Sequence, residues 1–280
     1  MTGGKSMEYF NKAKKFLKIP VVIISIVLLC AVFLIMQFNA QVYGSTWENY
    51  LISLAASFAE LIITISFVQY ALDKKKKSDA QNDELLRIKK FHKVLEIYIQ
   101  YYTLYYNQMT VPLGNERDVS SRNFKKNFKV SDLADLYKPT LLMKDNFRVS
   151  PVEKFFAVEK KLSDTFSQIL INQDFKFYPN LNIIFQNFIE QSLNDNPSDA
   201  ILGNINTRLG NKDSTVKISE MLKSHGNEYY EQLVAGKANH SNLMFPYCLL
   251  YEFMQSEATV IEQYKNYIQE ILPDTKNLEK

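Results

Sequence analysis

Residues that could carry chemistry are few in this 280-residue chain, and they lie far apart in the sequence. Nucleophilic catalysis needs a Ser or Cys held beside a base. The one pairing that the sequence suggests is Cys248 with His240, and their spacing across Pro246 defines no geometry. We therefore expect Cys248 to be a buried, unreactive thiol.

The histidines do not form a metal-binding pattern. A typical site has two His one helical turn apart with an acid between them, and the three histidines of this chain stand alone. His225 lies near Glu220 and Glu228 but falls on an apolar helical face, which favours a hydrogen-bonded core histidine over a ligand or a general base. Glycine-rich phosphate loops and catalytic serine motifs are also absent, so the sequence predicts a protein that is not an enzyme and has no cofactor and no metal.

Glu60 is the residue with the sharpest physical demand, because it lies inside a long apolar run. An ionised acid inside a bilayer is costly, so it must pair, face water or stay protonated. Ser53, Ser57 and Thr64 share its helical face, and small or hydroxylated residues let helices approach closely. This face is either a self-association seam or pore lining, or Glu60 bonds to Ser25 and locks two helices together.

Two apolar runs position these residues. Val21 to Phe38 carries no charged side chain and follows Pro20, and Leu51 to Leu72 is interrupted by Glu60 alone. About 20 apolar residues cross about 30 Å of hydrocarbon, so the runs predict membrane spans at 20–38 and 50–72 within a hairpin over residues 19–77. A cleaved signal peptide is the competing interpretation of the first run, but a small-residue cleavage pattern is missing.

Lysines on the outer flanks predict the orientation of this hairpin. Residues 1–18 carry five Lys, Lys74 to Lys77 follow the second run, and the connection at 39–50 has no Lys or Arg but contains the turn formers Gly44 and Ser45. The positive-inside rule then places both termini in the cytoplasm of a bacterial inner membrane. Basic residues also attract anionic lipid, or they are the ordinary flank of a membrane helix. The candidate lipid-surface residues are Lys74, Lys75, Lys76, Lys77, Lys125 and Lys126.

The remaining residues, 78–280, predict a cytoplasmic domain of helices. Apolar residues recur at a spacing of three and four from Leu85 to Tyr106, which predicts an amphipathic helix, continuous with the second span. Residues 111–130 predict a basic loop in which Phe124 and Phe128 alternate with lysines. This loop would contact lipid headgroups or remain solvated, and nucleic acid would be reached only indirectly.

Further helices are predicted after Ser150 and Pro151, after Pro179, from Val216 to Leu233 and from Leu243 to Leu272, with a short helix between two turns in residues 195–214. No convincing strand period is found. The predicted fold class is therefore all-α, with an N-terminal two-helix transmembrane hairpin followed by a helical bundle.

This layout, with spans at Val21 to Phe38 and Leu51 to Leu72, four lysines at 74–77 and a helical body without catalytic motifs, resembles the two-transmembrane-helix effectors of bacterial anti-phage defence systems, among them retron-type effectors. The resemblance covers the architecture of residues 1–77. It implies a domain that senses or binds a cytoplasmic protein partner, and a hairpin that oligomerises to perturb the bilayer in abortive infection. The alternative is a membrane-anchored signalling or tethering protein that recruits a cytoplasmic partner.

Overall fold

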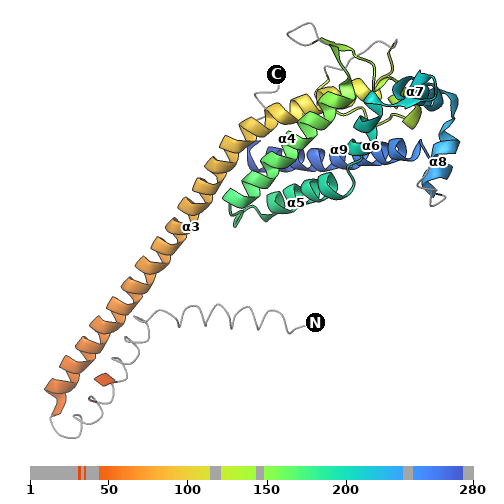
Figure 1. Ribbon diagram of the computed structural model, residues 1–280. Coiled ribbons are helices and arrows are strands. Elements are labelled where there is room, and N and C mark those ends of the chain that lie inside the picture. The colour runs from red at the N-terminus through yellow and green to blue at the C-terminus, as the bar shows by residue number, and fades with distance from the viewer. Residues whose placement is uncertain are drawn as a thin grey trace. The chain divides into compact units, whose positions relative to one another are not determined.

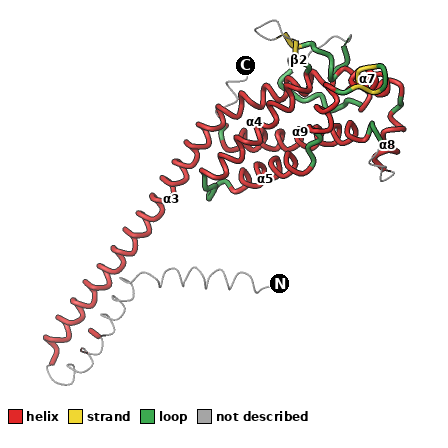
Figure 2. Tube along the Cα trace, viewed as in Figure 1, coloured by secondary structure: helices red, strands yellow, loops and turns green. Residues whose placement is uncertain are grey.

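The computed structural model describes residues 31–32, 35, 44–113, 121–142, 148–235 and 242–273. Most of these residues are helical, as Figure 2 shows, and the chain forms two compact units, residues 1–83 and 84–280. The predicted all-α class is confirmed at this level (Figure 1).

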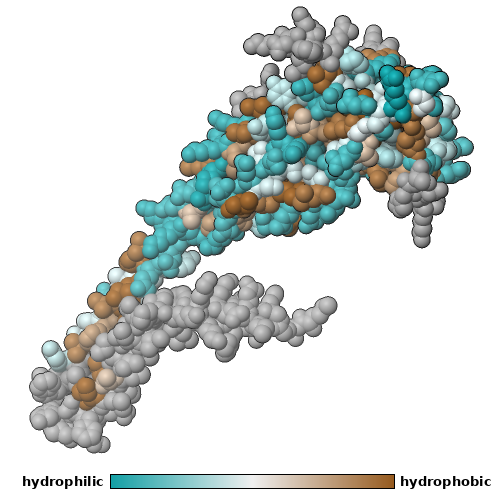
Figure 3. All heavy atoms as spheres, viewed as in Figure 1, coloured by the Kyte–Doolittle hydropathy of each residue, from teal (hydrophilic) through white to brown (hydrophobic). Residues whose placement is uncertain are grey.

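The helix α3, Gly44–Thr110, contains the predicted second span. From Ile52 onward it is long and apolar enough to cross a membrane, with a mean hydropathy of 1.7 in its apolar window and none of that window buried. Hydrophobic side chains lie along this part of α3 in Figure 3. The predicted first span, 20–38, lies outside the described residues except for Ala31, Val32 and Ile35, which are helical.

The predicted connection at 39–50 extends too far toward the C-terminus. The helix α3 already begins at Gly44, so residues 44–50 are helical and not part of a turn. Gly and Ser are common at helix starts as well as in turns, and their presence does not separate the two structures.

In the second unit, the part of α3 from Glu84 onward is amphipathic, as predicted. Its buried residues recur every three or four positions and include Ile88, Leu95, Ile99, Tyr102 and Tyr106. This face packs on a bundle made by α4 (Pro151–Asn172), α5 (Pro179–Asn194) and α9 (Phe245–Ile271). The helix beginning at Pro151 is confirmed, and Glu153 there accepts a hydrogen bond from the Ser150 backbone N–H at 3.0 Å.

Aromatic rings fill the centre of this bundle. Phe166 of α4 stacks on Phe185 of α5 with ring centroids 4.5 Å apart, and Tyr102 lies 5.0 Å from the Phe155 ring. Aromatic pairs at these distances stabilise a fold beyond the gain from burying their apolar area, so the rings stabilise the contact of α3, α4 and α5.

Smaller elements complete the second unit. They are η1 (Val130–Asp135), β1 (Leu141–Leu142), β2 (Arg148–Val149), α6 (Ser198–Leu202), η2 (Gly203–Asn206), β3 (Arg208–Leu209), β4 (Lys212–Asp213), α7 (Ser214–Ser224) and α8 (Asn227–Ala235). The strands form two antiparallel pairs, and Gly210 turns between β3 and β4 with a φ of 70°. The sequence did not predict these strands, since two residues are too few to show a period of two.

The single helix predicted from Val216 to Leu233 is wrong, because α7 ends at Ser224 and α8 begins at Asn227. His225 between them is extended, with φ −97° and ψ 138°, and its Nδ1 lies 2.8 Å from the Met221 carbonyl oxygen. Apolar spacing continues across the break by coincidence, so periodicity alone could not detect it.

The described part of the predicted basic loop is non-helical, as expected, but its phenylalanines are not at the surface. Phe124 and Phe128 are buried, and both rings lie edge-on to Tyr106. Asn107 holds the segment, because its amide donates to the Asn123 carbonyl oxygen at 3.0 Å and its Oδ1 accepts the Lys125 N–H at 3.0 Å.

Candidate functional site

The four residues of the predicted seam lie together on α3. Ser53, Ser57, Glu60 and Thr64 are all exposed, at a spacing of four, three and four that places them on one side of the helix. The Ser57 hydroxyl donates to the Ser53 carbonyl oxygen at 3.0 Å, so one of its hydrogen bonds is satisfied within the helix. Ser25, the alternative partner of Glu60, lies outside the described residues, and the two interpretations of Glu60 stay predictions.

The candidate lipid-surface lysines fall into two groups. Lys74 to Lys77 are exposed on α3 directly after the apolar stretch. Lys126 forms an ion pair with Glu262 of α9, and its Nζ lies 3.5 Å from the Thr259 hydroxyl. Lys125 is half-buried. The second group therefore lies against the protein itself more closely than the first.

The structure does not bring together the described residues that the sequence suggested for catalysis, Cys248 and His225. Cys248 is a free, buried thiol, and burial raises its pKa to about 11. His225 stacks on Tyr229 with ring centroids 4.2 Å apart, and His240 lies outside the described residues. Within the described part of the chain, no three His, Cys, Asp or Glu side chains come together as a metal site requires.

A buried acid pair is the feature that sequence reasoning missed. Glu159 of α4 and Glu257 of α9 are 1% and 0% exposed. The Tyr102 hydroxyl donates to Glu257 Oε2 at 2.6 Å. Glu159 accepts hydrogen bonds from Ser192 at 2.5 Å and from the Asn196 amide at 3.0 Å. The pair thus joins α3, α4, α5 and α9 through side chains.

Burial has a strong effect on the protonation of this pair. It raises the pKa of Glu257 well above 4.5, and the neighbouring Glu159 carboxylate raises it further against the opposing hydrogen bond from Tyr102. Burial also raises the pKa of Glu159, although its bonds to Ser192 and Asn196 act in the other direction. We expect the pair to hold a proton that stabilises the bundle, and its lack of solvent exposure makes it unsuited to a soluble substrate.

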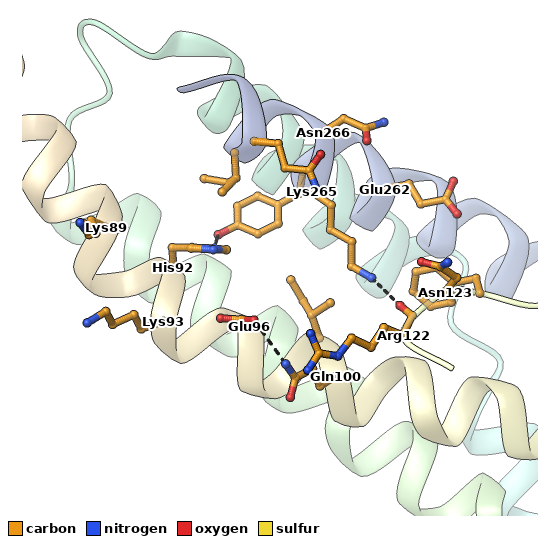
Figure 4. Close-up of a pocket in the computed structure, with 15 residues that line it drawn as sticks. Lys89, His92, Lys93, Glu96, Gln100, Arg122, Asn123, Glu262, Lys265 and Asn266 are labelled. Carbon is orange, nitrogen blue, oxygen red and sulfur yellow. Dashed lines mark hydrogen bonds between the residues drawn. The ribbon is translucent and has the colours of Figure 1, made fainter. Parts of the chain in front are cut away.

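An accessible cleft lies between α3 and α9. Its volume is about 560 Å³, within the range of small-molecule sites, which runs from about 300 to about 1,000 Å³. Figure 4 shows that one wall comes from α3, the other from α9, and that Arg122 and Asn123 lie at one end. The α3 residues of the lining follow one helical face from Lys89 to Gln100, and the α9 residues cover most positions from Glu262 to Gln269.

Polar contacts fix several side chains of this cleft, and Figure 4 marks three of them. His92 Nδ1 lies 3.0 Å from the Tyr264 hydroxyl, and Lys265 Nζ donates to the Arg122 carbonyl oxygen at 3.1 Å. The Gln100 amide donates to Glu96 at 3.3 Å. Lys265 Nζ also lies 5.1 Å from the centroid of the Phe124 ring.

The cleft combines buried apolar walls with a basic rim that is exposed except at half-buried Lys265. Ile99, Phe124, Tyr264 and Ile268 are each at most 9% exposed. The bases that line it are Lys89, Lys93, Arg122 and Lys265, against the acids Glu96 and Glu262. Sequence reasoning missed this site because its two walls are more than 150 residues apart, although the run of Lys89, His92 and Lys93 on one helical face was visible.

Comparisons of the chain with protein-family models, with curated proteins and with solved structures found no match.

Proposed function

We propose that this chain is an integral inner-membrane effector whose helical domain binds a partner and whose membrane hairpin oligomerises to perturb the bilayer, in the manner of anti-phage abortive infection. The observation that supports it is the apolar stretch of α3 from Ile52, none of which is buried by the protein, followed at once by Lys74 to Lys77. Such a surface needs lipid or another chain to cover it.

In this proposal both spans cross the membrane and both termini lie in the cytoplasm. The helix α3 carries the apolar stretch and, from Glu84, the side chains that pack in the domain core. A partner that alters the packing of residues 84–110 would therefore act on the same helix that carries Glu60. The seam of Ser53, Ser57, Glu60 and Thr64 gives the oligomer its contact.

The deciding experiment measures membrane potential with a dye in cells induced for the wild type or for Glu60→Leu. We expect the wild type to depolarise the cells and Glu60→Leu to abolish the effect, with Glu60→Gln intermediate because it keeps hydrogen bonding. Ser66→Leu is the matched control, since Ser66 lies about 120° away from Glu60 around the same helix and should leave depolarisation intact.

Normal potential in cells that contain membrane-inserted wild-type protein would contradict the effector proposal. Capture of a cytoplasmic protein by such a harmless hairpin protein would instead favour a tethering function. If a protease added outside intact cells cleaved the chain beyond residue 77, this result would contradict the proposed orientation.

A further inference from the structure

We propose that the cleft between α3 and α9 binds a phosphorylated small molecule that also has an apolar or aromatic part. The inference concerns the helical domain alone and does not rest on membrane perturbation. Its evidence is the combination of charge, wall chemistry and volume in one accessible site.

Charge is the first argument. Lys89, Lys93, Arg122 and Lys265 outnumber the two acids that line the cleft. Glu262 is already neutralised by its ion pair with Lys126, which approaches from outside the cleft. The effective lining is therefore strongly cationic, and Lys and Arg are the side chains that bind phosphate oxygens through charge-assisted hydrogen bonds.

The availability of these bases is the second argument. Within the described part of the chain, Lys89, Lys93 and the Arg122 guanidinium form no ion pair, and all three side chains are exposed. The Arg122 carbonyl oxygen accepts a hydrogen bond from Lys265 Nζ at 3.1 Å, which holds the backbone of Arg122 beside the cleft.

Wall chemistry is the third argument, and it defines the rest of the ligand. Buried Ile99, Phe124 and Ile268 line the same space as the basic rim, with Tyr264 beside them. These side chains are at most 9% exposed, so the apolar surface that they offer is small; a ring or acyl part would cover it, whereas a bare phosphate would not. The volume of about 560 Å³ accommodates such a molecule.

Isothermal titration calorimetry on the full-length protein in detergent tests the inference with three probes: ATP, pyrophosphate and dihexanoyl phosphatidic acid. We expect ATP or the phosphatidic acid to bind more tightly than pyrophosphate, which lacks an apolar part. Preference for ATP assigns the site to a soluble phosphate, and preference for the phosphatidic acid assigns it to a lipid headgroup.

Lys93→Glu combined with Arg122→Glu should weaken binding at least tenfold, because each change removes a donor to the phosphate oxygens and adds a carboxylate that repels them. The matched control, Lys160→Glu, reverses an exposed lysine on α4 outside the cleft and should change the affinity by less than about twofold. Binding of none of the probes, or equal losses in the double variant and the control, would overturn the inference. Affinity for pyrophosphate equal to that for the other two probes would overturn the assignment of an apolar part.

Discussion

Replacement of Glu257 by Gln should flatten the dependence of stability on pH. The Glu257 carboxyl is 0% exposed, and burial together with Glu159 raises its pKa well above 4.5. The folded protein then binds more protons than the unfolded chain at any pH between the unfolded and folded pKa values. Stability is greatest below the unfolded pKa and falls as pH rises toward the folded pKa.

The size of this effect follows from proton linkage. One proton of difference changes the free energy of unfolding by about 1.4 kcal/mol per pH unit. For a domain of this size, about 1 kcal/mol moves the melting temperature by about 2–4 °C, so the wild type should lose roughly 3–6 °C per pH unit over the range just above the ordinary value of 4.5. Glu257→Gln should remove most of this slope, since Gln can still accept the Tyr102 hydrogen bond without titrating.

The assay is thermal melting of the full-length protein in detergent, followed by far-ultraviolet circular dichroism between about pH 5 and about pH 7. Glu252→Gln is the control, because Glu252 lies on the same helix and is exposed. The reasoning is refuted if Glu257→Gln retains the wild-type slope while Glu252→Gln also leaves it unchanged.

Two further variants test the packing of the domain. Asp135→Asn should cost about 1–3 kcal/mol in the free energy of unfolding, since Asp135 accepts the Leu113 N–H at 3.0 Å and pairs with Lys138 at 2.9 Å. Burial alone would raise the pKa of Asp135, but its hydrogen bonds outweigh burial and lower the pKa. The wild type should therefore lose this stabilisation as the pH falls through the lowered pKa, whereas the variant should not. Equal acid sensitivity of the two proteins in thermal melts would contradict this prediction. Phe188→Ala should cost about 3–5 kcal/mol because the ring is 0% exposed and packs on Phe166, whereas Ile183→Ala, at 54% exposure on the same helix, should melt within a few degrees of the wild type.

Helices with strong local signals could be predicted from the sequence. Ser150 and Pro151 define the start of α4, and Pro179 defines that of α5, because a missing N–H costs nothing in a first turn. The long run of apolar residues at helical spacing predicted nearly the full extent of α9. The break at His225 was not predictable in this way, since Leu222 and Tyr229 keep helical spacing across it.

The acid pair could have been recognised in the sequence, because each acid occupies a position that the apolar pattern of its helix assigns to the core. Glu159 follows buried Phe155 by four residues and precedes buried Leu162 by three, so it occupies an apolar position of its helix. Glu257 stands in the same way between Phe253 and Ile261. A carboxyl on the buried stripe of a helix must find hydrogen-bond donors or a second carboxyl, and two such stripes in one bundle predict that the acids meet.

Polar contacts join α3 to α9. Tyr102 reaches Glu257 of α9, and His92 reaches Tyr264 of α9 at 3.0 Å. The first contact includes an acid whose pKa is raised, and the second lines the cleft. Protonation and a cleft ligand therefore act on the same pair of helices, and a ligand present at about 100 times its dissociation constant would add about 2.7 kcal/mol to the folded state. The pKa of Glu257 is raised, so its protonated form stabilises the folded domain, and a proton and a cleft ligand both favour the folded arrangement of α3 against α9.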